Sequence, residues 1–237
     1  MKILVTRPEI DQHQTIKALE TLGVEGLASP VMKIVPLSFS FPDASWQALV
    51  VTSRNGLRMV AGDQLERLKS VPLYCVGKRT ADLAAALGFI KIAFVAPNGA
   101  ELEKQLLSAL DPQKGEILYL SGKVRSGRLA EALSADGFSV RLCEVYESQA
   151  LTCLSDEVCE AIRTEQLDGI LLYSQRSCRI FLSLIEQVGL SEHLHKAIFY
   201  CLSPAVALPL EGLGYPLVVA EAPNERSLLA CVQNGHN

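Results

Sequence analysis

The sequence lacks the features that mark membrane proteins, disordered chains and nucleic-acid-binding proteins. Its 237 residues contain no apolar run of about 18 residues that would span a bilayer as a helix. Charged residues make up 20% of the chain and hydrophobic residues 49%, a balance too apolar for a disordered protein. The net charge of -4 and the absence of like-charge blocks argue against a nucleic-acid partner. The N-terminal apolar run is shorter than a signal-peptide core, so we expect a soluble, cytoplasmic protein.

Motifs for metals, nucleotides and common nucleophiles are missing as well. The seven cysteines are widely spaced without a C-x-x-C pair, and no histidines form an H-E-x-x-H pattern, so we expect neither a disulfide framework nor a metal site. No phosphate-binding G-x-x-x-x-G-K-[ST] or G-x-G-x-x-G sequence follows a strand, which leaves ATP or NAD without support. There is no G-x-S-x-G elbow and no visible pair of glycosidase carboxylates. What remains is an enzyme that works by positioning its substrate, or a binding protein.

Short β-rich runs alternate with helical patterns along the whole chain. Apolar strands alternating with helices predict an α/β fold with parallel sheets covered on both faces. The expected strands are residues 3–5, 48–51, 73–76, 92–95, 117–120, 169–173, 198–202 and 217–220. The expected helices include residues 12–22, 80–87, 99–110, 126–135 and 177–188, the fourth of them beginning at Ser126.

The chain also repeats itself, which predicts two similar lobes. The same 126 positions separate Gly77 from Ser203 and Pro97 from Pro223, and both pairs lie in similar local sequences. Several such pairs in order indicate a duplication. Two extended segments, 31–37 and 140–146, are either ordinary strands or a pair of crossovers between the lobes. With crossovers, lobe one comprises residues 1–36 plus 150–237 and lobe two residues 37–149, joined by a two-stranded β linker with a substrate cleft between them.

Small polar and basic residues follow six of the expected strands. In open α/β sheets, ligands bind beyond the carboxyl ends of the strands, where helix N-termini present free N–H groups. Each serine or threonine at such a place is either a helix N-cap or a ligand contact. Taken together, the six turns predict a surface that binds a polyanionic small molecule. They are Thr6-Arg7, Ser53-Arg54, Gly77-Lys78-Arg79-Thr80, Ser121-Gly122-Lys123, Ser174-Gln175-Arg176 and Ser203.

With these turns in place, the chain resembles the uroporphyrinogen-III synthase family. The resemblance is spread over nearly the whole length and depends on the order and spacing of short motifs rather than on any one of them. They are Val5-Thr6-Arg7-Pro8, Val51-Thr52-Ser53-Arg54-Asn55-Gly56, Val76-Gly77-Lys78-Arg79-Thr80-Ala81, Leu120-Ser121-Gly122 through Gly127-Arg128-Leu129, Val145-Tyr146-Glu147, and Leu172-Tyr173-Ser174.

The resemblance implies a two-lobed α/β lyase that needs no cofactor and binds no metal. Family members cyclise linear hydroxymethylbilane with loss of water and inversion of the terminal pyrrole ring. The product, uroporphyrinogen III, is the precursor of haem and related tetrapyrroles. The implied partner is thus a small polycarboxylate, which agrees with the polyanion-binding surface predicted from the turns. We expect a monomer without nucleic-acid or membrane partners.

The resemblance also implies roles for individual residues. Tyr146 occupies the family's linker-strand tyrosine position and is our candidate catalytic proton donor; the alternative is a tyrosine that packs its ring at a lobe junction. Candidate substrate-binding residues are Thr6, Arg7, Ser53, Thr80, Gly122, Ser174 and Ser203.

One turn departs from the family pattern. Where a Gly-Pro-Thr-Thr-Ala-like turn is usual, this chain has Ser203-Pro204-Ala205-Val206-Ala207, which lacks two hydroxyls, although Ser203 could supply one from a neighbouring position. The competing interpretation of the whole chain is a non-catalytic two-lobed protein that binds a polyanionic small molecule.

Overall fold

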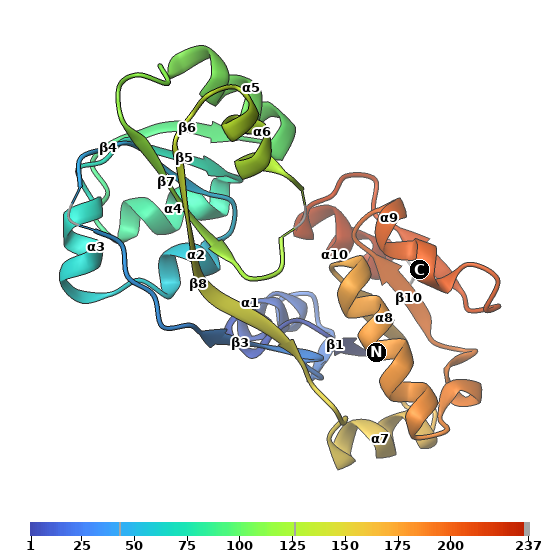
Figure 1. The fold of residues 1–237 in the computed structure, drawn as a ribbon. Coiled ribbons are helices and arrows are strands. Elements are labelled where there is room, and N and C mark those ends of the chain that lie inside the picture. The colour runs from blue at the N-terminus through green and yellow to red at the C-terminus, as the bar shows by residue number, and fades with distance from the viewer. Residues whose placement is uncertain (43, 126, 235–237) are drawn as a thin grey trace. The chain divides into compact units, whose positions relative to one another are not determined.

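The computed structural model describes residues 1–42, 44–125 and 127–234. The chain divides into two compact units, Met1–Lys33 with Gln149–Asn237 and Ile34–Ser148. Each unit holds a sheet with helices on both faces, as the ribbon in Figure 1 shows. The predicted α/β class with two parallel-dominated sheets is confirmed. No helix in the described part of the chain is both long and apolar enough to cross a membrane.

The first unit contains a five-stranded sheet in which all strands run parallel. Its strand order is β11 (Leu217–Val219), β10 (Ile198–Cys201), β9 (Gly169–Leu172), β1 (Lys2–Val5) and β2 (Glu25–Ala28). Because successive strand residues point to opposite faces, the sheet buries two separate cores. Helices α1 (Glu9–Glu20) and α10 (Glu225–Asn234) cover one face. Helices α7 (Asp156–Arg163), α8 (Gln175–Gln187) and α9 (Pro204–Ala207) cover the other, with the short 3-10 helices Ser191–Leu194 and Leu208–Leu210.

The six-stranded sheet of the second unit follows the same plan. Its order is β3 (Met32–Pro36), β8 (Val140–Ala150), β7 (Glu116–Gly122), β4 (Trp46–Val51), β5 (Leu73–Val76) and β6 (Ile92–Ala96). Strands β4 to β8 are parallel. Helices α2 (Arg54–Arg58), α3 (Gly62–Leu68) and α4 (Lys78–Ala86) cover one face, and α5 (Gly99–Ala109) and α6 (Leu129–Ala135) the other.

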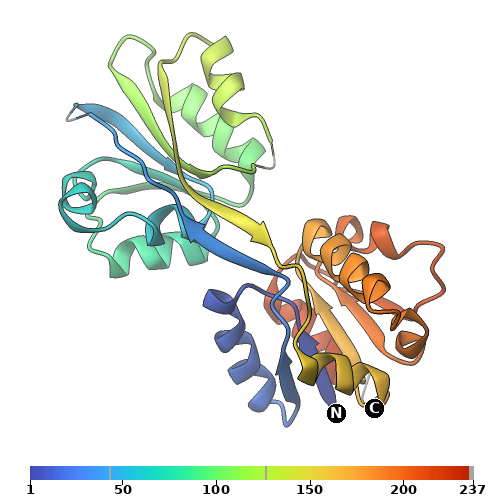
Figure 2. The ribbon, with the colours of Figure 1, turned by 60° about the horizontal axis from the view of Figure 1, so that its bottom comes forward.

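Strands β3 and β8 carry the chain from one unit to the other, as Figure 2 shows. The Leu37 N–H donates to the carbonyl of Val145 at 3.0 Å, and the Leu151 N–H donates to the carbonyl of Val31 at 2.9 Å. Residue numbers rise along β3 as they fall along β8, so the two strands are antiparallel. The extended segments at 31–37 and 140–146 therefore form the predicted two-stranded linker.

Sequence patterns predicted most strands but missed β2 and the short helices α2, α3, α7 and α9. Strand β2 reads Glu25-Gly26-Leu27-Ala28 and has no apolar run. A β-carbon at Gly26 would lie 3.1–3.2 Å from side-chain atoms of Ile16 and Leu19, so glycine lets helix α1 pack closely on this strand. The predicted helix start at Ser126 lies outside the described residues, and α6 begins at Leu129.

Candidate functional site

The six predicted turns all lie at the carboxyl ends of parallel strands. In the first unit, Thr6 and Arg7 follow β1, Ser174 follows β9 and Ser203 lies two residues beyond β10. Because the carboxyl ends of parallel strands meet at one edge, these turns share an edge of the first sheet. The corresponding edge of the second sheet holds Ser53, Thr80 and Gly122 after β4, β5 and at the end of β7, together with Tyr146 on β8.

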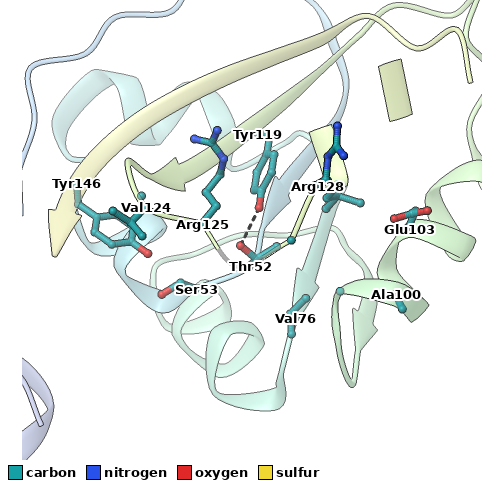
Figure 3. Close-up of a pocket in the computed structure, with 14 residues that line it drawn as sticks. Thr52, Ser53, Val76, Ala100, Glu103, Tyr119, Val124, Arg125, Arg128 and Tyr146 are labelled. Carbon is teal, nitrogen blue, oxygen red and sulfur yellow. Dashed lines mark hydrogen bonds between the residues drawn. The ribbon is translucent and has the colours of Figure 1, made fainter. Parts of the chain in front are cut away.

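A pocket of about 520 Å³ opens at this edge of the second sheet (Figure 3). It brings together three of the predicted site residues: Tyr146, Ser53 and Gly122. Residues that were not predicted as site residues complete its lining. They are Thr52, Val76, Gly99, Ala100, Glu103, Tyr119, Val124, Arg125, Gly127, Arg128 and Leu129.

Tyr146 lies in this pocket with its ring against the backbone of Gly122. Its side chain is 9% exposed. A β-carbon at position 122 would lie 2.7 Å from Cε2 and Cζ of the ring and 3.0 Å from Oη. The backbone of β8 is anchored at the same point, because the Lys123 N–H donates to the Tyr146 carbonyl at 2.9 Å. In this structure, Gly122 therefore makes room for the tyrosine; the predicted substrate contact of Gly122 stays a prediction.

Two further hydroxyls meet in the pocket. The Tyr119 hydroxyl on β7 lies 3.0 Å from Oγ1 of Thr52, which directly follows β4. Burial raises the pKa of the Tyr119 phenol, so it stays protonated at neutral pH. Thr52 belongs to the family-like motif that begins at Val51. Tyr119 lies in an apolar strand, where the sequence pattern indicates only a core residue. The position of its hydroxyl in the pocket depends on the neighbouring strand β4, which carries Thr52, and not on the local pattern.

The charged residues of the lining favour an anionic ligand. The lining contains two arginines, Arg125 and Arg128, and one carboxylate, Glu103. Arg125 forms an ion pair with Glu144 at 2.7 Å, whereas Arg128 is exposed and has no ion pair with any residue that the structure describes. Gly99 and Ala100 add the first turn of α5, where backbone N–H groups attract negative charge.

Ser53 and Thr80 hold the starts of two helices on this edge. The Ser53 hydroxyl accepts a hydrogen bond from the Asn55 N–H at 3.3 Å as the N-cap of α2, and Ser53 also lines the pocket. Thr80 is buried in the first turn of α4. The N-cap of this helix is Gly77, whose φ of 82° lies in a region that favours glycine. Thr80 is not among the pocket's lining residues.

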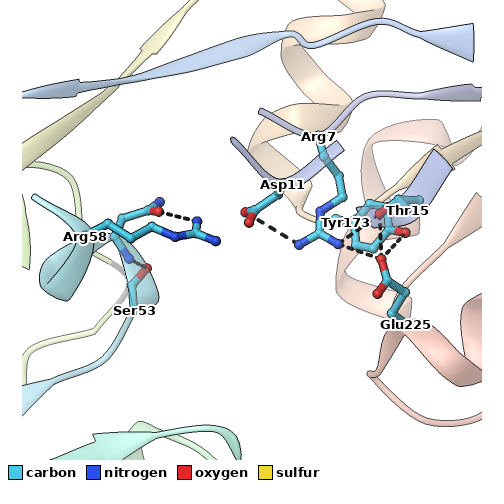
Figure 4. Close-up of polar contacts among 8 residues, drawn as sticks. Arg7, Asp11, Thr15, Ser53, Arg58, Tyr173 and Glu225 are labelled. Carbon is cyan, nitrogen blue, oxygen red and sulfur yellow. Dashed lines mark hydrogen bonds and ion pairs between the residues drawn. The ribbon is translucent and has the colours of Figure 1, made fainter. Parts of the chain in front are cut away.

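In the first unit, Thr6 and Arg7 use their polar groups inside the protein, and Figure 4 shows the contacts of Arg7. The fully buried Thr6 hydroxyl donates to the carbonyl of Leu171 at 2.7 Å. The Arg7 guanidinium pairs with Glu225 at 2.6 Å and Asp11 at 3.5 Å, and it lies 4.4 Å from the ring centre of Tyr173. Both side chains thus have partners inside the protein, and their substrate contacts stay predictions.

Glu225 is the common acceptor of this network. It accepts hydrogen bonds from Arg7, from the Thr15 hydroxyl at 2.6 Å and from the Tyr173 hydroxyl at 3.1 Å. Burial, and then the negative charge of Glu225, raise the pKa of the Tyr173 phenol. The network ties the start of α10 to the ends of β1 and β9, so it stabilises this edge of the sheet.

Ser174 and Ser203 differ in how their hydroxyls are used. Ser174 forms a capping box with Ser177: its hydroxyl accepts from the Ser177 N–H at 3.0 Å, and the Ser177 hydroxyl accepts from the Ser174 N–H at 3.2 Å. Ser203 precedes Pro204 at the start of α9, a helix described in full, and its hydroxyl caps no N–H there. Of these two hydroxyls, that of Ser203 is thus the more available for a ligand.

A metal centre finds no support in the described residues. Within 1–42, 44–125 and 127–234, no group of three or more His, Cys, Asp or Glu side chains is arranged to hold a metal ion.

Comparison with known proteins relates this architecture to one family. A family model described as uroporphyrinogen-III synthase HemD matches residues 13–230. The chain belongs to the uroporphyrinogen-III synthase family. A search of curated protein sequences gives no match.

Two solved uroporphyrinogen-III synthase structures share the fold at low sequence identity. The Helicobacter pylori structure aligns with a TM-score of 0.69 at 17% identity, covering 98% of each chain. A mutant from Thermus thermophilus aligns with a TM-score of 0.57 at 15% identity, covering 100% of this chain and 98% of the other. In this member of the uroporphyrinogen-III synthase family, the pocket with Tyr146 is the candidate active site.

Proposed function

We propose that this protein converts hydroxymethylbilane to uroporphyrinogen III, as a cyclising lyase that releases water. The family match over residues 13–230 is the observation that carries the proposal. The pocket at the carboxyl edge of the second sheet supports it with the groups that such a reaction uses.

Tyr146 is the proposed proton donor. As the C–O bond of the hydroxymethyl group breaks, the pyrrole nitrogen supplies electrons and the leaving oxygen takes a proton from the phenol, so that water departs. The resulting azafulvene is attacked by the substituted carbon of the terminal ring, and the spiro intermediate fragments and recloses with that ring inverted. The proton lost when the last ring regains aromaticity balances the proton donated at the start. Acid catalysis of this kind typically contributes 10²–10⁴-fold.

The pocket's charges suit the substrate, whose side chains are acetates and propionates. The exposed Arg128 lines the pocket without an ion pair to any described residue, and the first turn of α5 adds backbone N–H groups. Charge-assisted hydrogen bonds of this type hold carboxylates in defined positions. Fixing the chain ends close together is the main task of the enzyme, because cyclisation is then favoured over release of the reactive intermediate. Binding of the remaining carboxylates by Thr6, Arg7, Thr80, Ser174 and Ser203 stays a prediction, as does a monomeric enzyme in the cytoplasm.

The test is to supply freshly prepared hydroxymethylbilane to the purified protein and to separate the uroporphyrin isomers after oxidation. In buffer alone the substrate closes without inversion to isomer I, which serves as the baseline. We expect isomer III to predominate with the protein present. If a protein with a cooperative thermal transition yields isomer I alone, it is no synthase, and a binding measurement with the same substrate then tests the non-catalytic role.

A further inference from the structure

Tyr119 presents a hydroxyl to the pocket from the core of the sheet. Its side chain is 4% exposed and packs among the buried residues between the sheet and helices α5 and α6. Strands β4 and β7 are neighbours, with Val50 opposite Tyr119 in the register. This pairing places the phenol 3.0 Å from the Thr52 hydroxyl, just beyond the end of β4. Both residues line the pocket with Tyr146.

The chemistry of the two hydroxyls sets the direction of the bond between them. A phenol is a much stronger acid than an aliphatic alcohol, so the phenol is the better donor and the threonine oxygen the better acceptor. Burial is the largest influence on the pKa of Tyr119 and raises it, although the hydrogen bond with Thr52 and the charge of Arg125 act in the opposite direction, so the donor proton stays in place. With Oγ1 accepting from Tyr119, the proton of the Thr52 hydroxyl is left to donate to another group.

We propose that Tyr119 is a positioning residue that orients the Thr52 hydroxyl as a hydrogen-bond donor to a substrate carboxylate in the pocket. The inference rests on the proposed synthase function and adds to it a residue that the sequence motifs do not contain. Hydrogen bonds in series also strengthen one another, so the phenol makes Thr52 a better donor as well as a more rigid one. A carboxylate held in this way keeps the chain end in place while the reactive intermediate exists.

The experiment is a double-mutant cycle in the full-length protein with hydroxymethylbilane as substrate. Tyr119→Phe, Thr52→Val and the double variant are compared by kcat, KM and the fraction of isomer III. We expect Tyr119→Phe to lower kcat/KM about 3- to 10-fold, the effect of losing one hydrogen bond, with a rise in KM and in isomer I. In the Thr52→Val background the Tyr119 substitution should have no further effect, because its effect passes through the threonine. Thr52→Ser keeps a hydroxyl, so adding Tyr119→Phe to this variant should still lower kcat/KM.

Tyr74→Phe is the matched control. Tyr74 lies on β5, which pairs with β4 on the side away from β7, and belongs to the same buried cluster as Tyr119, but it does not line the pocket. The control should leave kcat/KM and the isomer ratio within twofold of the original protein. Thermal unfolding of every variant, with assays run well below the lowest midpoint, removes loss of folded protein as an explanation.

Three outcomes would overturn the inference. If Tyr119→Phe and Tyr74→Phe give the same kcat/KM and isomer ratio, the Tyr119 hydroxyl is only structural. If the effects of Tyr119→Phe and Thr52→Val on kcat/KM are independent, Tyr119 does not act through the threonine. In both cases isomer III from the unsubstituted protein would leave the synthase function standing. If the unsubstituted protein makes only isomer I, the synthase function fails and the positioning role fails with it.

Discussion

The ring of Tyr146 on β8 lies against Gly122 at the end of β7, where any larger side chain would collide with it. The two residues are paired in the sheet after a register shift between Ser121 and Gly122. A β-carbon on Gly122 would come within 2.7 Å of two ring carbons, a distance that real side chains do not adopt. The position of the Tyr146 ring, the proposed proton donor, thus requires that residue 122 has no side chain.

Gly122→Ala should therefore impair catalysis more than folding. We expect turnover to fall at least tenfold, because a misplacement of about 1 Å can cost 10²-fold in a positioned reaction. Turnover and thermal midpoint are measured together. Gly99→Ala is the matched control, since Gly99 lines the same pocket but a β-carbon there meets no atom within 4 Å. If both alanine variants behave alike, the contact of Gly122 with Tyr146 does not matter for turnover.

Tyr146→Phe should lower turnover by 10²-fold or more while leaving the thermal midpoint nearly unchanged. The phenylalanine ring fills the same space against Gly122 but has no proton to give to the leaving hydroxyl. The measurements are single-turnover rates of hydroxymethylbilane loss and a thermal unfolding curve. A loss of stability as large as the loss of activity would identify a purely structural tyrosine.

Removing Glu225 should destabilise the first unit. Arg7 and Glu225 are 9% and 11% exposed, and Glu225→Ala also leaves the Thr15 and Tyr173 hydroxyls without this acceptor. Breaking a buried, hydrogen-bonded charge pair costs on the order of 2–4 kcal/mol when part of the network remains, here Asp11. Urea unfolding measures the change. Glu165→Gln, which breaks an exposed ion pair with Lys196, is the control and should leave the urea midpoint where it is.

Stability should fall as the pH rises above about 9. Burial raises the pKa of the thiols of Cys75 and Cys178 to about 11 and that of Cys201 to about 12, from an ordinary value of 9.0. The folded state therefore keeps protons that the unfolded state releases, and the stabilisation present below pH 9 is lost between pH 9 and about 12. Urea midpoints at pH 8 and pH 10.5 measure the slope.

Two alanine variants separate the buried thiols from other alkaline effects. Cys201→Ala should make the decline with pH shallower, whereas Cys153→Ala removes an exposed thiol and should leave it unchanged. An identical decline in both variants would show that other groups control the alkaline limit.

Much of the fold was predictable because its strands are short apolar runs that end in turn residues. Strand β5 was predicted with its observed bounds, Leu73–Val76, since both of its faces are covered. Strand β2 escaped prediction because its place in the sheet depends on Gly26 beneath α1 rather than on apolar side chains. Tyr119 escaped for a related reason: along the strand it is one more core position, and only the neighbouring strand brings Thr52 to its hydroxyl.

Local sequence was enough to indicate the α/β class, the polar turns after the strands and the family. Tertiary structure decided which of those polar groups have hydrogen-bond or ion-pair partners inside the protein. Thr6 donates to Leu171, 165 positions away, and Arg7 pairs with Glu225, 218 positions away. The pocket similarly joins Thr52 to Tyr119, 67 positions apart. Partners this distant along the chain meet only when the sheets assemble, so the local sequence does not show which polar groups will have them.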